Sequence, residues 1–424
     1  MKNHITSLLL LLAACTGAYA SDVNQASERI DPTLEISAPD TIDYSRYRFL
    51  RADENSIAMN GADWSTLAAR FRSACEGDSI FSIVYLGDSH IQADFGGSVL
   101  RRRIADVAGS AGRGLIIPFR IAGTNQPVDY TMTTGSEIVA SRLLKQPWST
   151  DMPFTGIGVV PSEGNMLLKI TAEEPFDRIT VLTKGPDAAI TSVYGGSVAD
   201  GILYSHEDSG SIALEEPRMD VHLRLSMVPS SVLAGVVLRD ADAGSFVHSI
   251  GNNGATYGTY NQVNSFGEEL AALRPDLVII ALGTNEAFGT FTRESLETDI
   301  DSLVRTIRAA NPRTEIMMVT PTECFRKKNR RRRRSSLVVN TKVATVRSVV
   351  RDYAEAHGIP LYDTYAFAGG SGSAARMKSA AVLGHDGVHF TSEGYRLWGA
   401  LLSDALLREL LRGSGGFLLD INAE

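Results

Sequence analysis

The chain has 424 residues, of which 44% are hydrophobic and 21% charged, and its formal net charge is −8. This composition excludes a disordered or collagen-like chain, and three cysteines are too few for a disulfide scaffold. The acidic balance argues against general nucleic-acid binding. The only long apolar run lies in the first twenty residues, so we expect no integral membrane span.

Residues 1–20 predict an export signal, with Lys2, an apolar run at 8–12 and small residues before the cleavage site. Two cleavage sites compete. Ala18-Tyr19-Ala20 suits ordinary signal peptidase, whereas Leu12-Ala13-Ala14-Cys15 resembles a bacterial lipobox that would make Cys15 a lipidated first residue. Either site places the mature protein outside the cytoplasm, in the periplasm or anchored by lipid to a membrane surface. In that oxidising compartment Cys75 and Cys324 would either form a disulfide or remain as two free buried thiols.

Residues 21–77 are polar and irregular apart from a helical stretch at Trp64–Cys75, and they predict a linker and lead-in. From residue 78 onward, apolar runs of strand length alternate with helical periodicity, in segments 78–118 and 246–413, before a tail at 414–424. This alternation predicts a three-layer α/β/α domain with a parallel sheet. The expected strands are Ile80–Leu86, Leu277–Leu282, Ile316–Val319 and Ile359–Tyr362. The expected helices carry the apolar sets Leu100/Ile104/Val107/Ala108, Leu296/Ile300/Leu303/Ile307, Val339/Val343/Val346/Val350 and Trp398/Leu401/Leu402/Ala405, and one more ends before Pro275.

Residues 119–245 interrupt that rhythm. Val221–Leu225 alternates with period two, and glycine and proline punctuate the segment throughout. Met166–Thr171, Ile179–Thr183 and Leu233–Leu238 are also strand-like. We therefore expect an inserted, sandwich-like all-β module inside the α/β domain.

A first candidate for chemistry is Ser89, in Gly87-Asp88-Ser89-His90 directly after the first apolar strand. A serine at the carboxyl end of a parallel strand lies where such folds bind ligands, and the following helix offers backbone N–H groups to a negative charge. The structural alternative is a residue that only caps the helix.

Two further strand ends carry groups that suit an oxyanion. Asn285 follows the apolar strand 277–282, and a side-chain amide there can donate a hydrogen bond to a developing charge. Gly254 lies in Gly251–Thr256, where a glycine permits close approach of its N–H. Gly251 and Gly258 are neighbours that could serve instead, and an ordinary turn explains both segments equally.

The third piece is Asp386-Gly387-Val388-His389, just before the last helix. A serine hydroxyl needs an adjacent imidazole, and the imidazole needs a carboxylate to set its tautomer. His385 with His389 suggests a metal alternative, but no cysteine or second acidic ligand accompanies them, so we expect no metal and no cofactor.

Together, in this order, these residues resemble the SGNH (GDSL-like) hydrolase superfamily, over roughly 80–118 and 246–412. The resemblance implies a flavodoxin-like fold, a triad of Ser89, His389 and Asp386, and an oxyanion hole made by Ser89, Gly254 and Asn285. His90 replaces the leucine of the family's usual GDSL, and Glu286 stands where aspartate is common; we expect neither change to affect the chemistry.

Within the superfamily, Gly87–Phe95 followed by Gly112-Arg113-Gly114 resembles the peptidoglycan O-acetylesterases of Gram-negative bacteria. Those enzymes are exported, carry GDSH at the nucleophile, and have a β-sandwich similar to a carbohydrate-binding module after it. The resemblance implies a serine esterase acting on an acetylated glycan, with peptidoglycan as the expected substrate, in the periplasm or at the outer membrane. Three alternatives stay open: an O-acetyltransferase, an acetylesterase for another carbohydrate such as xylan, and a glycan-binding lipoprotein with vestigial catalysis.

A basic run stands apart from this acidic chain, and it follows the strand 316–319 in what we expect to be a loop. It is either a solvated loop or a site that captures an acidic polymer or anionic lipid. Its eight cations are Arg326, Lys327, Lys328, Arg330, Arg331, Arg332, Arg333 and Arg334.

Overall fold

The computed structural model describes residues 42–51, 54–195, 204–208, 211–328 and 336–412. The expected export signal, Cys15, the cations Arg330–Arg334 and the tail from 414 lie outside the described residues. None of the helices within those ranges combines the length and apolar character required to span a membrane.

Five parallel strands form the first sheet, in the spatial order β11-β1-β12-β13-β16. The second strand in chain order therefore lies on one side of the first, and the other three follow on the opposite side. This is the order of flavodoxin-like sheets, in which ligands bind at the carboxyl ends of the strands beside the first one. The strands are β1 (Ile80–Gly87), β11 (Gly244–Gly251), β12 (Leu277–Ala281), β13 (Glu315–Val319) and β16 (Leu361–Tyr362).

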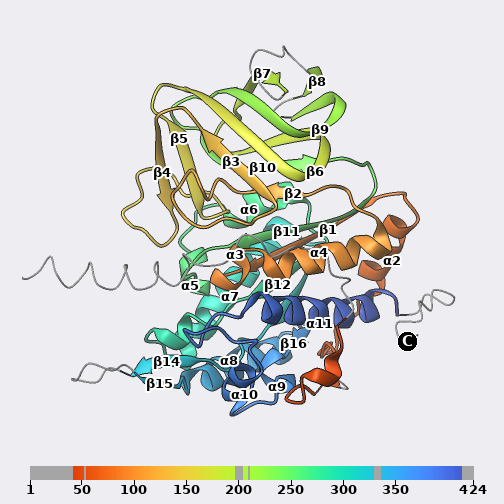
Figure 1. Ribbon diagram of the computed structural model, residues 1–424, viewed down its shortest axis with the longest axis vertical. Helices are drawn as coiled ribbons and strands as arrows, with labels where there is room; N and C mark the ends of the chain where they lie inside the picture. The colour runs from red at the N-terminus through yellow and green to blue at the C-terminus, as the bar shows by residue number, and fades with distance from the viewer. Residues whose placement is uncertain (1–41, 52–53, 196–203, 209–210, 329–335, 413–424) are drawn as a thin grey trace, which may run out of the picture. The chain divides into compact units, whose positions relative to one another are not determined.

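Helices cover both faces of this sheet, as the alternation of strand and helix predicts (Figure 1). Successive side chains of β1 point to opposite faces, so Ile83 belongs to one core layer and Val84 to the other. The layer of Ile83 is closed by α2 (Ser65–Cys75), α4 (Phe95–Ala108) and α11 (Ser392–Leu410). The layer of Val84 is closed by α6 (Phe266–Leu270), α7 (Arg293–Ala310) and α8 (Lys342–Ala356). The three-layer prediction is confirmed.

A second, antiparallel sheet interrupts the first. Its nine strands are hydrogen-bonded into one sheet, where the sequence suggested a sandwich, and its two longest strands pass through β-bulges. They are β2 (Gly114–Ile116), β3 (Tyr130–Thr134), β4 (Ile138–Arg142), β5 (Ile157–Pro161), β6 (Asn165–Lys184), β7 (Ala189–Tyr194), β8 (Tyr204–Asp208), β9 (Ser211–Ser226) and β10 (Val232–Arg239). The sheet thus starts before the expected boundary at 119 and ends before 245. The local pattern of Gly114–Ile116 does not reveal its partner, which is β10 across the whole insert.

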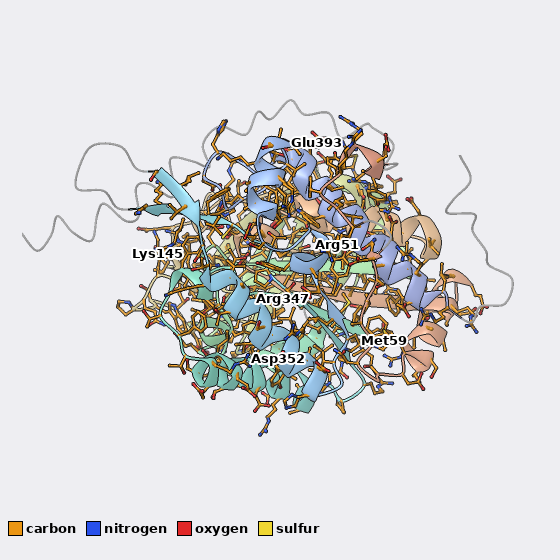
Figure 2. The ribbon with its side chains drawn as sticks, turned by 90° about the horizontal axis from the view of Figure 1, so that it is seen from below. Arg51, Met59, Lys145, Arg347, Asp352 and Glu393 are labelled. Carbon is orange, nitrogen blue, oxygen red and sulfur yellow. The ribbon has the colours of Figure 1, made fainter. Side chains whose placement is uncertain are left out.

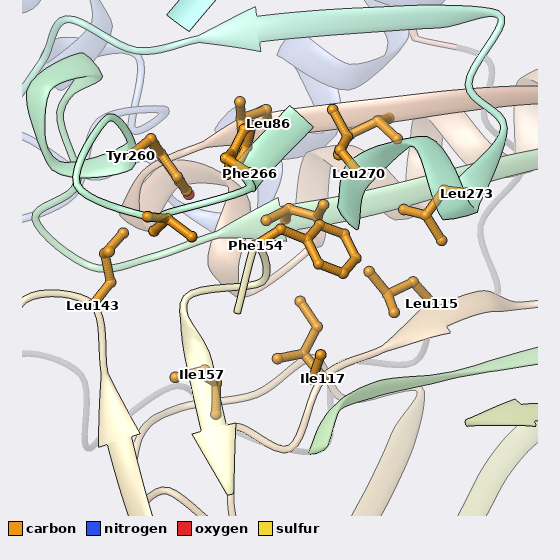
Figure 3. Close-up of a cluster of buried hydrophobic side chains, with 14 of the residues drawn as sticks. Leu86, Leu115, Ile117, Leu143, Phe154, Ile157, Tyr260, Phe266, Leu270 and Leu273 are labelled. Atoms are coloured by element: carbon orange, nitrogen blue, oxygen red, sulfur yellow. The ribbon is translucent and has the colours of Figure 1, made fainter. Parts of the chain in front are cut away.

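The two sheets share a hydrophobic core (Figure 3). Leu86 of β1 belongs to the same buried cluster as Leu115 of β2, Phe154, and Phe266 and Leu270 of α6. All five are 2% exposed or less. The antiparallel sheet is therefore packed against the parallel one by apolar contacts, which hold it beside the site.

A buried ionic cluster joins the same two parts. Asp94, at the start of α4, accepts from Arg101 at 2.6 Å and from Arg113 at 3.0 Å, and Arg113 also contacts Asp129 at 3.0 Å. Ser249 of β11 donates to the other oxygen of Asp94. Each charge has an opposite partner, as burial requires.

Three expectations about local structure are wrong. The described part of the expected linker packs into the core, where Tyr47 and Trp64 are buried and Ala58 bridges to Leu361. Val339 belongs to a strand, because α8 begins only at Lys342. Arg326–Lys328 lie in a strand rather than a loop.

The remaining elements are short. Arg347 of α8, labelled in Figure 2, forms an ion pair with Asp363, which precedes the short helix at Thr364–Phe367. The chain also contains β14 (Phe325–Lys328) and β15 (Ser336–Val339), α3 (Ser89–Gln92), α5 (Tyr257–Tyr260), α9 (Thr364–Phe367) and α10 (Ser373–Ser379).

Candidate active site

Ser89 lies at the carboxyl edge of the parallel sheet, where β1 ends and α3 begins. Asp88 caps α3, because its carboxylate accepts from the backbone N–H of His90 at 2.9 Å. This cap turns the chain sharply between strand and helix. The turn presents the Ser89 hydroxyl at the helix N-terminus.

Asp386 organises the turn that carries His389. One carboxylate oxygen accepts the backbone N–H groups of Val388 (2.9 Å) and His389 (3.0 Å). The other oxygen lies 2.6 Å from Nδ1 of His389. One aspartate thus holds both the backbone and the ring of a histidine three residues away.

The tertiary structure brings this turn to Ser89 from 300 residues along the chain. The Ser89 Oγ lies 2.8 Å from Nε2 of His389. With Nδ1 protonated toward Asp386, Nε2 carries the lone pair that accepts the serine proton. The predicted trio is therefore assembled with the geometry of a nucleophile, a base and an orienting acid.

The electrostatics of the pair favour a charged Asp386. Burial raises the pKa of this carboxyl, but the hydrogen bond and charge of His389 outweigh burial and lower the pKa to about 2. Burial also lowers the pKa of His389, and contact with Asp386 reverses that effect and leaves the pKa above its ordinary value of 6.5. The imidazole is thereby made a better proton acceptor.

The backbone N–H groups of Ser89 and Gly254 are the two backbone donors expected of an oxyanion hole. Neither Ser89 nor Gly254 donates its backbone N–H to another group in the described residues. Gly254 has a φ of +85°, and it is exposed in the loop between β11 and α5. The alternatives are less suitable: Gly251 is buried in β11 against the backbone of Gln92, and Gly258 faces Asp299.

Asn285 follows β12 at the same edge, but its amide already has partners. Nδ2 donates to Oδ2 of Asp88 and to the carbonyl oxygen of Ala255, each at 3.0 Å. Both amide hydrogens are thus occupied within the protein, so an oxyanion at Asn285 would share or displace one of them. Burial raises the pKa of Asp88 to about 6.

Sequence reasoning missed the contacts of His90. Its ring lies beside His389, with 5.3 Å between centroids, and its Nδ1 is 3.2 Å from the hydroxyl of Tyr395. Burial lowers the pKa of His90 to about 3, so this neighbour adds no positive charge beside His389. Its position directly after the serine was the available signal.

Glu286, the other departure from the family pattern, is buried and directly follows Asn285 in the chain. Burial raises its pKa to about 7, and its Oε1 accepts the backbone N–H of Tyr257 at 2.9 Å. This bond ties the segment after β12 to the start of α5. Glu286 therefore supports the loop that contains Gly254.

The antiparallel sheet supplies loops to the edge of the site. Gln92 donates to Asn125 of the insert at 2.7 Å and accepts the backbone N–H of Asn253 at 2.7 Å. Leu144 reaches Gly254: its Cγ would lie 3.6 Å from a Cβ built there. The insert is thus part of the wall beside the candidate oxyanion hole.

Cys75 and Cys324 are both free thiols, so the disulfide alternative is not realised in this structure. In the part of the chain that the structure describes, His, Cys, Asp and Glu side chains nowhere gather in threes as metal ligands.

Part of the chain matches a known family model. Residues 231–397 match the GDSL-like Lipase/Acylhydrolase family. This region contains Gly254, Asn285, Asp386 and His389. Ser89 lies before it in the sequence, and most strands of the antiparallel sheet come between the two. A comparison with curated proteins found no match.

One solved structure has the same fold over most of this chain. A peptidoglycan O-acetylesterase superposes with a TM-score of 0.68 at 21% identity, covering 84% of this chain and 99% of that one. A lipase/acylhydrolase from Enterococcus faecalis gives a TM-score of 0.29 at 22% identity, covering 38% and 76% of the two chains. A carbohydrate esterase family 3 protein from Talaromyces cellulolyticus gives 0.28 at 20%, covering 40% and 72%.

Residues 231–397 therefore match a GDSL-like acylhydrolase domain, and the fold of the peptidoglycan O-acetylesterase extends over 84% of this chain. The expected resemblance, the α/β fold with its parallel sheet and the ester-hydrolase class are confirmed.

Proposed function

We propose that this protein is an exported serine esterase that removes O-acetyl groups from a polysaccharide, with peptidoglycan as the substrate. The observation that carries the proposal is the chain of contacts from Ser89 through His389 to Asp386, at 2.8 and 2.6 Å. The substrate class is supported by the structural similarity to a peptidoglycan O-acetylesterase. The superposition covers 99% of the chain of that enzyme.

The reaction follows from these positions. His389 takes the proton of Ser89 as Oγ attacks the acetyl carbonyl, and the backbone N–H groups of Ser89 and Gly254 with the amide of Asn285 hold the oxyanion. The intermediate collapses as His389 returns the proton to the departing sugar oxygen, which leaves acetyl on Oγ. Water, deprotonated by His389, then releases acetate and restores Ser89.

The competing functions make different predictions for the acetyl group. An acetyltransferase would pass the acetyl from Ser89 to a sugar hydroxyl in place of water. A glycan-binding protein with vestigial catalysis has no use for an assembled triad, and the distances at Ser89 and His389 favour an enzyme over it.

The test is acetate release from O-acetylated peptidoglycan, acetylated xylan and p-nitrophenyl acetate by wild type, Ser89→Ala and the control Ser302→Ala. We expect release from peptidoglycan that falls by at least about a thousandfold in Ser89→Ala and is unchanged in Ser302→Ala, which lies on the exposed side of α7. Activity on xylan alone would contradict the substrate. Transfer of acetyl to added glycan without acetate release would identify a transferase.

We propose that the mature protein is located in the periplasm and is attached to the outer membrane by a lipid on Cys15. Mass spectrometry of the mature amino terminus tests it: a diacylglyceryl-modified Cys15 would establish the anchor, and a terminus after Ala20 would replace it with a free periplasmic protein.

A further inference from the structure

The hairpin of β14 and β15 is attached directly to the turn that holds two groups of the triad. The backbone N–H of Phe325 donates to the carbonyl oxygen of Gly387 at 2.7 Å. A Cβ built on Gly387 would lie 2.8 Å from the Cβ of Phe325 and 3.2 Å from Leu337. The hairpin therefore packs tightly on the residue between Asp386 and His389. Figure 1 shows it on the same side of the parallel sheet as α3 and α5.

The register of the hairpin assigns its side chains to two faces. Phe325 pairs with Val339 and Lys327 with Leu337, and directly opposed residues of an antiparallel pair share a face. Since Phe325 and Leu337 meet Gly387, Lys327 extends from the face that contacts the triad turn. Arg326 and Lys328 lie on the other face, so positive charge is presented on both sides.

These three cations have no acidic partner in the part of the chain that the structure describes. All three are exposed, and neither strand of the hairpin contains an acidic residue. The nearest carboxylate in sequence, Glu323, is buried and accepts the backbone N–H groups of Gly372 and Ala374. A chain with a net charge of −8 thus keeps uncompensated positive charge beside its candidate site.

A fourth cation reinforces the same face. The Nζ of Lys378 lies 5.9 Å from the centroid of the Phe325 ring and donates to the carbonyl of His385 at 3.2 Å. It therefore sits between the hairpin and the triad turn. Positive charge from two elements far apart in sequence converges next to Asp386 and His389.

We propose that Arg326, Lys327, Lys328 and Lys378 form a docking site for carboxylate groups of an acidic glycan polymer, namely the stem-peptide carboxylates of O-acetylated peptidoglycan. This inference rests on the proposed esterase function. An acetyl ester is neutral and small, so the charge recognised here must belong to another part of the substrate. Because the hairpin is hydrogen-bonded to Gly387, an anion bound there lies beside the turn that carries Asp386 and His389, which favours a substrate over an anionic membrane.

The experiment compares two triple variants. The first, Arg326→Gln/Lys327→Gln/Lys328→Gln, neutralises the hairpin. The control, Arg72→Gln/Arg308→Gln/Arg313→Gln, removes the same charge from exposed positions near the amino ends of the strands, the opposite edge of the sheet. Substrates are O-acetylated peptidoglycan, the same polymer with its carboxylates amidated, and p-nitrophenyl acetate.

We expect the hairpin variant to lose about tenfold or more in kcat/KM on native peptidoglycan at low salt. It should match wild type on the amidated polymer and on p-nitrophenyl acetate. The difference should vanish near 1 M salt, where the Debye length falls to about 3 Å. The control variant should behave as wild type throughout.

Equal loss in both triple variants, or a loss on p-nitrophenyl acetate, would overturn the proposal, the latter by indicating that the triad turn itself was disturbed. Loss of binding to phosphatidylglycerol vesicles with unchanged turnover of peptidoglycan would overturn it in favour of a lipid surface. Cosedimentation of Ser89→Ala protein with insoluble peptidoglycan, with and without the hairpin substitutions, tests docking without catalysis. That result separates failure of the docking site from failure of the esterase function.

Discussion

Asn285 donates from Nδ2 to the carboxylate of Asp88 at 3.0 Å, so the candidate oxyanion donor is held by the residue that precedes the candidate nucleophile, Ser89. The other oxygen of Asp88 accepts the backbone N–H of His90. Asp88 thus uses both of its oxygens to fix the two sides of the site.

Asp88→Asn should therefore reduce kcat by about tenfold with little change in KM. An asparagine has one acceptor oxygen and can satisfy either Asn285 or the N–H of His90, but not both. Misplacing one oxyanion donor costs part of the roughly 10²–10³-fold that its complete removal costs. Steady-state kinetics on p-nitrophenyl acetate checks this, with Asp352→Asn as the control, a half-exposed residue of α8 that pairs with Arg293 and Arg351. A change in KM alone would contradict the positioning role.

The activity should rise with pH as His389 loses its proton. Contact with Asp386 raises the pKa of His389 above 6.5, and the ring accepts the serine proton only when neutral. Activity is therefore lost as the pH falls through that raised value. In Asp386→Asn the raising influence disappears, so the inflection should move to lower pH while kcat falls by about 10⁴-fold. The pH profile of kcat/KM for both proteins measures this; an inflection that stays in place would show that another group controls the rate.

Arg113→Ala should destabilise the fold by about 3–5 kcal/mol, because it leaves Asp94 and Asp129 with less compensation inside the protein. Arg113 is 3% exposed. The control Arg305→Ala breaks an exposed pair with Asp301 and should cost less than about 1 kcal/mol. Urea unfolding of both variants measures the free energy of unfolding. An equal decrease in the two variants would show that the buried ionic cluster does not stabilise the fold more than an exposed ion pair does.

Gly254→Ala should lower both stability and kcat, whereas Gly61→Ala should lower only stability. Their φ angles are +85° and +84°, and a left-handed backbone costs an ordinary residue about 1–2 kcal/mol. A Cβ at Gly61 meets nothing within 4 Å, and at Gly254 it meets Leu144 at an ordinary contact distance. Both substitutions are thus expected to destabilise the protein through backbone strain and not through a steric clash of the new Cβ. A fall in kcat of about tenfold specific to Gly254→Ala would assign its N–H to the oxyanion; equal kinetics in the two variants would remove it from the site.

Much of the framework could be predicted because it depends on short-range patterns. Apolar runs such as Leu277–Leu282 mark buried strands wherever they occur, and polar groups that follow them meet at one edge of a parallel sheet. The link between Asp386 and His389 is equally local, since three residues in one turn bring both groups together. The candidate residues, their order and the fold class were thus determined by the sequence alone.

Only the tertiary structure decided which of these groups meet and what else they touch. The contact of Ser89 with His389 depends on the position of β1 within the sheet and on the turn before α11. The same holds for the Asp88–Asn285 bond and for the pairing of β2 with β10. Local periodicity carries no information about such partners, because strand order and register are settled by the packing of the whole core.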